Sequence, residues 1–244
     1  MHLRPYNPSD ISSMATIEAL CNLTDPLERF RSQKIESNWD LYRSSLLRYL
    51  QMLLLMPGVV CWVIEGDLGD EVLGVKSLES RDVNGEVIGW AIWGRDGVGP
   101  VARNWQMSGE SCWNKFNLAL QSASIHYFSI WDPTINHSNV AKIQPIISTT
   151  CEEASFTECW HLHGLYILPT CQRRGLGSLA VKWGITQSAA EKVPIVVNSS
   201  SAGVPLYEKL GFKRAMKQEF DQFFETGGEG MWTMVWDPKD QNAV

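Results

Sequence analysis

A glycine-containing turn between an apolar strand and an amphipathic helix constrains this chain more than any other segment. The turn spans residues 167–178 and reads ILPTCQRRGLGS. A turn that opens a helix presents free backbone N–H groups and the positive end of the helix dipole at one point. Glycines at positions 175 and 177 let phosphate oxygens approach the backbone closely. The segment therefore predicts a site for an anion, and above all for a pyrophosphate.

The spacing of this turn excludes two common nucleotide-binding loops. A Walker loop requires a lysine directly after its second glycine, whereas Gly177 is followed by Ser178. A Rossmann loop requires the spacing G-x-G-x-x-G, which the turn does not have. An ordinary glycine-rich turn that binds no ligand has the same pattern, so the flanking segments are needed to decide.

Apolar periodicity predicts a mixture of helices and strands. Helices are expected over residues 11–20, 39–56, 110–127, 175–192 and 203–210, with Asp10 as an N-cap and Pro57 and Gly58 as a stop signal. Strands are expected over residues 3–5, 59–65, 86–93, 161–168, 194–198, 212–220 and 231–236. The alternation of elements after residue 157 is typical of an α/β protein.

Two regions give weaker patterns. Residues 71–78 fit either a strand or part of a loop, and residues 84–85 (NG) predict a turn before the strand at 86–93. Apart from the helix at 110–127, residues 94–157 are expected to be irregular. A segment of this length inside a domain is usually a binding element or poorly ordered.

Two motifs in the second half of the chain resemble the GNAT superfamily of N-acetyltransferases. QRRGLG at residues 172–177 is similar to the family's pyrophosphate loop, Q/R-x-x-G-x-G/A. LYEKLGF at residues 206–212 resembles the short family helix that follows this loop. The resemblance covers residues 158–215 firmly and the strands near residues 3–5 and 87–91 more loosely.

The resemblance implies a GNAT fold of the α/β (α+β) class. We expect residues 1–244 to form a single acetyltransferase domain with an insertion at about residues 95–157. Its centre would be one mixed, largely antiparallel twisted sheet of about seven strands, flanked by helices and splayed at the two central strands.

The resemblance also implies acetyl-CoA as co-substrate. The pantetheine arm would pair with the strand at Leu165, Tyr166 and Ile167, and the N–H of Ile167 would polarise the thioester carbonyl. Tyr207 would be a general acid near the coenzyme sulfur, with a packing role as the alternative. The other residues expected to bind the coenzyme are Gln172, Arg173, Arg174, Gly175, Leu176, Gly177, Ser178, Asn198 and Ser200.

The pattern HLH at residues 161–163 points to the acceptor. Because residues i and i+2 of a strand face the same side, His161 and His163 would both face a cleft beside the thioester. A primary amine has a pKa of about 10 and must lose a proton before it attacks, for which a neutral histidine is a suitable base or relay. The pattern is similar to that of arylalkylamine (serotonin) N-acetyltransferases. Two polar residues on a solvated strand face are the alternative.

These features predict an acetyl-CoA-dependent N-acetyltransferase that acts on a small-molecule amine by direct transfer in a ternary complex. A second hypothesis is a GNAT-fold enzyme with another acyl donor, a hydroxyl acceptor or non-acetylating chemistry. A third is a non-catalytic acyl-CoA-binding module. No metal is expected, because the remaining histidines and the acidic residues show no ligand spacing.

Composition narrows the partners and the location. A net charge of −6 argues against nucleic acid as a partner. The most apolar run, residues 46–56, is too short to cross a bilayer, so no membrane partner is expected. Six cysteines without a C-x-x-C pair, and a start without an apolar signal core, predict reduced thiols in a cytoplasmic protein. The sequence leaves the oligomeric state open.

Overall fold

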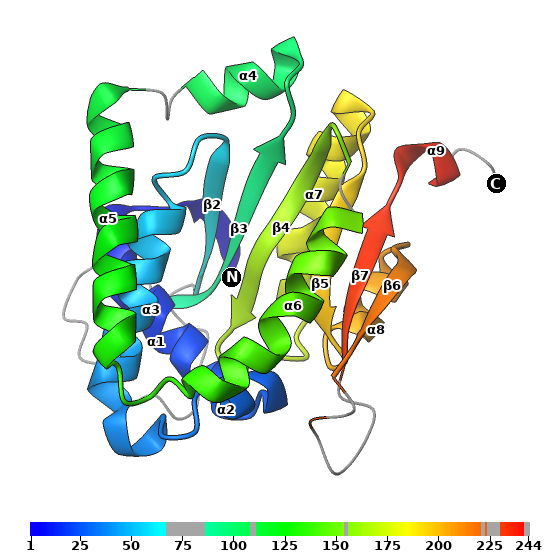
Figure 1. The fold of residues 1–244 in the computed structure, drawn as a ribbon. Helices are drawn as coiled ribbons and strands as arrows, with labels where there is room; N and C mark the ends of the chain where they lie inside the picture. Colours follow the sequence, from blue (N-terminus) through cyan, green and yellow to red (C-terminus); the bar gives the residue numbers. More distant parts are fainter. Residues whose placement is uncertain (67–85, 108–110, 154–155, 221–222, 224–229, 242–244) are drawn as a thin grey trace.

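The fold is built around one seven-stranded sheet. A computed structural model describes residues 1–66, 86–107, 111–153, 156–220, 223 and 230–241. The strand order is β1-β2-β3-β4-β5-β7-β6 (Figure 1). The strands are β1 (His2–Pro5), β2 (Val59–Glu65), β3 (Val87–Asp96), β4 (Cys159–Ile167), β5 (Ile195–Ser200), β6 (Lys213–Glu219) and β7 (Gly230–Trp236). The predicted strands are confirmed, with β3 continuing beyond its predicted end to Asp96.

The sheet opens between its two central strands. β4 and β5 are parallel, whereas the other neighbouring pairs are antiparallel. The ladder between β4 and β5 joins three residue pairs and ends at Leu162 and Val197. β4 continues to Ile167 and β5 to Ser200, so the strands diverge beyond this point. The expected fold class, with a sheet splayed at its two central strands, is confirmed.

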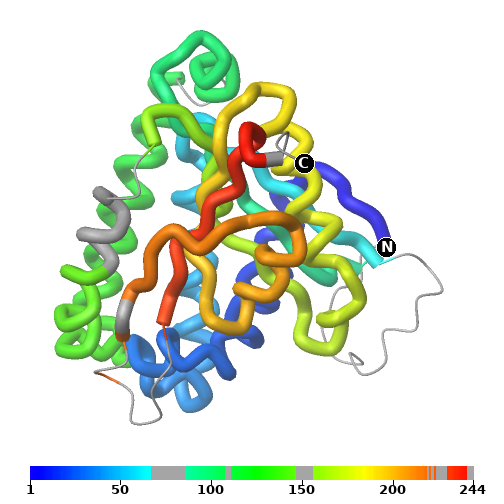
Figure 2. Tube along the Cα trace, turned by 90° about the vertical axis from the view of Figure 1, so that its right-hand side faces the viewer, coloured from blue at the N-terminus to red at the C-terminus, as the bar shows by residue number. Residues whose placement is uncertain are grey.

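Helices cover both faces of the sheet. They are α1 (Ile11–Asn22), α2 (Pro26–Arg31), α3 (Trp39–Leu53), α4 (Pro100–Gln106), α5 (Cys112–Trp131), α6 (His137–Glu153), α7 (Leu176–Glu191), α8 (Val204–Lys209) and α9 (Pro238–Gln241). Figure 2 shows α5 and α6, in green, on one side of the sheet and α7, in yellow, on the other. α1 packs against β3 and β4.

Tryptophans of β3 and β4 fill the core on both faces. The indole N–H of Trp90 donates to the carbonyl of Met14 in α1 (3.0 Å). The ring of Trp93 faces α7, where it leaves no room for a Cβ at Gly184. Trp160 meets Trp183 of α7 with ring centroids 5.5 Å apart. These tryptophans therefore pack the core on both faces of the sheet.

The predicted insertion contains three helices. α5 confirms the helix predicted over residues 110–127, but the expectation of irregular structure elsewhere in the segment is wrong, because α4 and α6 lie there. Asn136 accepts a hydrogen bond from the N–H of Asn139 (3.1 Å) at the start of α6, a local cap that the apolar pattern does not reveal. Pro145 lies inside α6, which tolerates it while burying Ile143.

Asp10 is the N-cap residue of α1, as predicted, but its side chain makes no cap hydrogen bond to that helix. A short 3-10 turn (Pro8–Asp10) leads directly into α1. The Asp10 carboxylate instead accepts from the Arg4 guanidinium (2.7 and 2.9 Å) and from the N–H of Asn7 (2.7 Å). The Asp10 carboxylate is therefore bound by Arg4 of β1 and by the cap of the preceding 3-10 turn rather than by α1.

Other boundaries differ little from expectation. α3 begins at Trp39 as predicted and ends at Leu53, with a turn before Gly58. The predictions for residues 71–78 and for the turn at residues 84–85 lie outside the described residues. Within the described part of the chain, no helix combines the length and apolar character needed to cross a membrane.

Candidate functional site

The diverging end of β4 presents backbone groups to the gap beside β5. The N–H of Leu168 donates to the carbonyl of Ile88 in β3 (2.8 Å). Because alternate N–H groups of an antiparallel strand point to opposite sides, those of Leu165 and Ile167 point away from β3. The N–H of Tyr166 points toward β3. Since the ladder to β5 has already ended at Leu162, the N–H groups of Leu165 and Ile167 face the gap.

The loop after β4 has a backbone suited to an anion. A 3-10 turn (Pro169–Cys171) leads to Gly175, whose φ of 83° is left-handed. α7 then begins at Leu176 without a side-chain cap. Its first N–H groups, at Leu176, Gly177 and Ser178, therefore lack acceptors within the helix. Together with the helix dipole, they form the donor set that a pyrophosphate requires.

Side chains of the loop hold it in place. Gln172 Nε2 donates to the carbonyl oxygen of Ile167 (3.1 Å), which ties the loop to the end of β4. Arg174 donates to the carbonyl of Thr170 (3.3 Å). The side chains of Arg173 and Arg174 are exposed, so their charge lies at the loop surface.

Tyr207 lies on α8, which meets the start of α7 at Gly177. A Cβ on Gly177 would lie 3.0 Å from Cδ2 of Leu206 and 3.8 Å from the Leu165 side chain, so α7, β4 and α8 converge there. Tyr207 is buried, and this burial raises the pKa of its phenol well above the ordinary value. Among the described residues its hydroxyl has no hydrogen-bond partner. Tyr207 is therefore protonated at neutral pH and able to donate.

A β-bulge brings the two histidines of β4 together. Leu162 pairs with Trp93 and Gly164 with Ile92, which leaves His163 as the extra residue. The His161 and His163 rings lie 4.6 Å apart, between centroids. They share a face, as the alternation predicts, although the bulge interrupts that alternation.

Both histidines are neutral at pH 7. Burial lowers the pKa of His161, and nearby Asp96 offsets part of this effect. Burial lowers the pKa of His163 to about 4, and the charge of His161 adds to the shift. Each imidazole can therefore accept a proton, although its low pKa makes it a weak base.

The two residues of β5 that were expected to bind the coenzyme, Asn198 and Ser200, form their hydrogen bonds with β7 and with the start of α8. Asn198 Oδ1 accepts from the hydroxyl of Thr233 in β7 (2.8 Å). The carbonyl of Ser200 accepts from the N–H of Gly203 (2.9 Å), just before α8. Among the described residues, no hydrogen bond joins either residue to residues 172–178.

Two residues of α1 that the sequence pattern did not indicate lie against the end of β4. The Cys21 thiol donates to the carbonyl of Ile167 (3.3 Å). Glu18, one turn earlier, is buried beside Tyr166, whose hydroxyl interacts with its carboxyl. A charged residue within the apolar stripe of the helix predicted over residues 11–20 was the available signal for Glu18.

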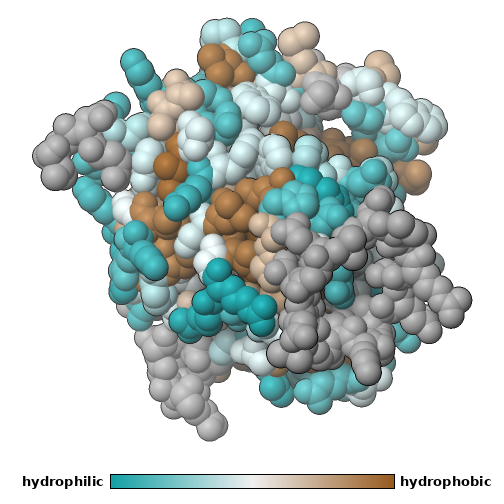
Figure 3. All heavy atoms as spheres, turned by 180° about the vertical axis from the view of Figure 1, so that it is seen from behind, coloured by the Kyte–Doolittle hydropathy of each residue, from teal (hydrophilic) through white to brown (hydrophobic). Residues whose placement is uncertain are grey.

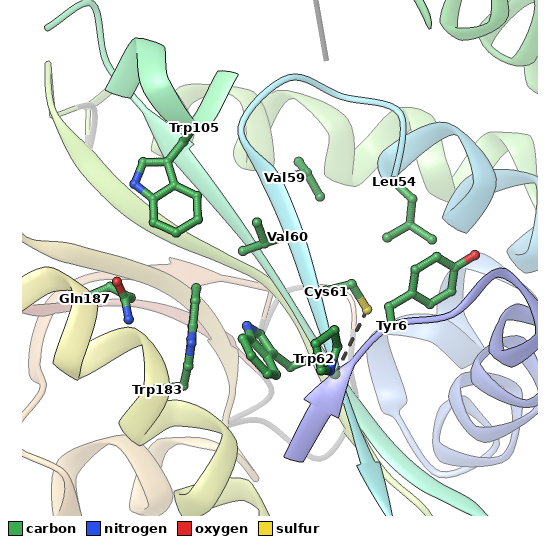
Figure 4. Close-up of a pocket in the computed structure, with 10 residues that line it drawn as sticks. Tyr6, Leu54, Val59, Val60, Cys61, Trp62, Trp105, Trp183 and Gln187 are labelled. Carbon is green, nitrogen blue, oxygen red and sulfur yellow. Dashed lines mark hydrogen bonds between the residues drawn. The ribbon is translucent and has the colours of Figure 1, made fainter. Parts of the chain in front are cut away.

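A separate groove lies on the α7 side of the sheet. It encloses about 520 Å3 beside β2 and α7 (Figure 4). The face seen from behind, on which α7 lies, exposes apolar side chains near its centre (Figure 3). The groove is lined by Pro5, Tyr6, Leu54, Val59, Val60, Cys61, Trp62, Trp105, Trp183 and Gln187. None of the predicted site residues lines it.

No metal centre accompanies the site in the part of the chain that the structure describes. There, no group of three or more His, Cys, Asp and Glu side chains is arranged to hold a metal ion.

Sequence comparisons match the second half of the chain. Residues 140–224 match the family model described as "Acetyltransferase (GNAT) domain". This range includes residues 158–215, which carried the predicted resemblance. A protein of Ajellomyces capsulatus named "Probable acyltransferase SID5" is 37 % identical over 43 residues. That segment is 18 % of this chain and 32 % of the relative, so the chain spans about a third of the relative's length.

Solved structures resemble the whole fold. A structure from Corynebacterium glutamicum, titled histone acetyltransferase HPA2 and related acetyltransferase, has a TM-score of 0.53 at 14 % identity and covers 97 % of this chain and 96 % of that chain. A mosquito structure titled arylalkylamine N-acetyltransferase like 5b has a TM-score of 0.48 at 15 % identity, with 96 % and 98 % covered. This likeness is too distant to bear on the acceptor. The sheet has the fold of GNAT acetyltransferases, and residues 140–224 carry the sequence pattern of their domain.

Proposed function

We propose that this protein transfers the acetyl group of acetyl-CoA to an amine of a small molecule, by direct transfer in a ternary complex. The proposal rests chiefly on the unpaired N–H groups at the start of α7, which lie next to the open edge of β4. The N–H groups at the start of α7 suit a pyrophosphate. The N–H groups at the open edge of β4 suit an extended pantetheine arm. The match of residues 140–224 to the GNAT domain supports the same assignment.

Backbone groups would hold the co-substrate. The N–H groups of Leu176, Gly177 and Ser178 bind the pyrophosphate, and that of Leu165 pairs with the pantetheine arm. Acetyl-CoA supplies an acetyl group that is already activated as a thioester. The N–H of Ile167 donates to the thioester oxygen and stabilises the negative charge that develops there.

Side chains on two elements would move the protons. His161 or His163 accepts the proton that the amine loses, directly or through water. Tyr207 donates a hydrogen bond to the leaving sulfur, which its buried, protonated phenol is able to do. Because both imidazoles are weak bases, this site favours an acceptor that a neighbouring group helps to deprotonate.

A single domain in the cytoplasm fits these features. The seven strands form one sheet, so the matched segment and the N-terminal strands share a core. Five cysteines among the described residues are free thiols, which agrees with a compartment that keeps thiols reduced.

Two measurements, made one after the other, test the proposed function. Calorimetry with coenzyme A should detect binding by the wild-type protein. A thiol-release assay with acetyl-CoA should then show turnover with at least one amine from a panel of tryptamine, polyamines and a histone peptide. The double substitution His161→Ala and His163→Ala should lower turnover while leaving coenzyme affinity within about twofold.

Other outcomes identify other functions. Coenzyme binding without thiol release would indicate a non-catalytic binding module. Release only with longer acyl thioesters or with hydroxyl acceptors would indicate a different acyl transfer. The absence of coenzyme binding would remove the functional assignment altogether.

A further inference from the structure

The mechanism above leaves one buried carboxyl unused. Glu18 of α1 is 6 % exposed, and its Oε2 atom has no hydrogen-bond partner among the described residues. A buried acceptor without a partner costs about 1–3 kcal/mol. Such a group calls for a donor, which a water molecule, an ion or a ligand can supply. Glu18 therefore marks a site for a hydrogen-bond donor.

Glu18 lies close to the expected thioester position. Cys21 follows three residues later on the same face of α1, and its thiol donates to the carbonyl of Ile167 (3.3 Å). Tyr166, the neighbour of Ile167 on β4, interacts with the Glu18 carboxyl through its hydroxyl. Two contacts thus place Glu18 within about one helical turn of the strand end that carries the proposed oxyanion donor.

The charges around Glu18 favour a cation. Glu28 and Arg31 of α2 form an ion pair, and the hydroxyl of Tyr42 donates to the other oxygen of Glu28 (3.3 Å). Arg31 is therefore already paired with Glu28, and its charge lowers the pKa of Glu18 by less than burial and Glu28 raise it. The other groups that interact with Glu18 are the thiol of Cys21 and the phenols of Tyr42, Tyr49 and Tyr166. No uncommitted positive charge faces Glu18 from α2, α3 or β4 in the described residues.

The surroundings of Glu18 also set the protonation state of its carboxyl. Burial is the main cause that raises the pKa of Glu18 to about 8, and the negative charge of Glu28 adds to it. With this pKa the carboxyl is largely protonated at neutral pH. Tyr49, which interacts with Glu18, is 44 % exposed, so this cluster borders solvent.

We propose that Glu18 binds the ammonium group of the acceptor and restricts the acceptors to primary alkylamines. A neutral primary amine that takes up the proton of the carboxyl becomes an ammonium with three N–H donors and leaves a carboxylate. A charge-assisted hydrogen bond between these two groups is among the stronger ones in proteins. The inference rests on the proposed function, because it concerns the acceptor of that reaction. It adds a positioning and specificity residue on α1 to the groups on β4 and α8.

Equilibrium binding tests Glu18 separately from catalysis. The wild type and Glu18→Gln, each saturated with coenzyme A, are titrated with tryptamine and with putrescine, and 3-ethylindole serves as a probe without an amino group. Glu36→Gln, the same change at an exposed position, is the matched control. We expect Glu18→Gln to weaken binding of the preferred amine at least tenfold, with Kd for coenzyme A and 3-ethylindole unchanged.

A stability measurement distinguishes ligand binding from a structural role. Removing a carboxyl that has an unpartnered oxygen should leave the Tm of Glu18→Gln equal to or above that of the wild type. A lower Tm, equal amine affinity in both proteins, or a coenzyme-bound wild type that binds neither amine would each overturn the proposal. Weakened amine binding without thiol release would refute the proposed reaction but leave the ammonium site standing.

Discussion

The imidazole of His163 occupies the space where a side chain of Gly94 would lie. A Cβ built on Gly94 would collide with Nε2 of His163, which packs across β3 at the bulge in β4. The absence of a side chain at position 94 therefore sets the position of this imidazole. Gly94 belongs to the supporting structure of the proposed site, although it would touch neither substrate.

Gly94→Ala should displace His163 and lower turnover by about 10²-fold, because small misplacements of a reacting group have effects of this size. Coenzyme affinity, measured by calorimetry, should stay the same. In a double-mutant cycle, His163→Ala should add little further loss to Gly94→Ala. Gly66→Ala is the control, since a Cβ there meets its nearest atoms at 3.6 and 3.7 Å. Full additivity of the two changes would contradict the positioning role of Gly94.

Gly175→Val should weaken coenzyme A binding about tenfold or more. A Cβ at Gly175 meets no atom within 4 Å, so the effect arises from the φ of 83° rather than from a collision. A β-branched residue resists this conformation, whereas asparagine tolerates it. Gly175→Asn should accordingly retain more affinity than Gly175→Val in the same calorimetric titration. Equal affinities for the two variants would show that the left-handed backbone is unimportant for binding.

Tyr207→Phe should lower turnover by about 10²-fold, within the range expected when a general acid is lost. Its hydroxyl has no partner among the described residues, so the free energy of unfolding should change by less than about 1 kcal/mol. Thiol release and urea unfolding measure the two quantities. A variant that loses stability but keeps its turnover would assign Tyr207 to packing.

His163 should make the fold sensitive to acid. Its pKa of about 4 in the folded protein lies below the ordinary value of 6.5. Between these values the unfolded chain binds more protons, so the free energy of unfolding falls as pH is lowered through this window. The loss from His163 alone would approach about 3 kcal/mol.

His163→Gln should remove this loss, so its stability relative to the wild type should rise as pH falls from about 6.5 to about 4. Urea unfolding at several pH values measures the difference. His126→Gln, the same change at an exposed position on α5, should leave the pH dependence unaltered. Parallel curves for His163→Gln and the wild type would mean that His163 is not shielded from water.

The local sequence determined most of the sheet and the loop after β4. Runs such as residues 59–65 and 194–198 are short, apolar and bounded by turn residues, so their strands follow from local preference alone. Gly175 and Gly177 at the start of an amphipathic helix likewise indicate an anion-binding turn without reference to the rest of the chain. The spacing of His161 and His163 was enough to predict that they share a face.

Tertiary structure decided what the local pattern left open. Asp10 lies at the N-cap position that the pattern predicts, but its carboxylate pairs with Arg4 of β1 rather than with the first N–H groups of α1. Contacts between segments far apart in the sequence decide three further features. These are the bulge at His163, the space at Gly94 and the burial of Glu18. Hydrophobic periodicity records which face of an element is buried, but not which distant residue it meets there.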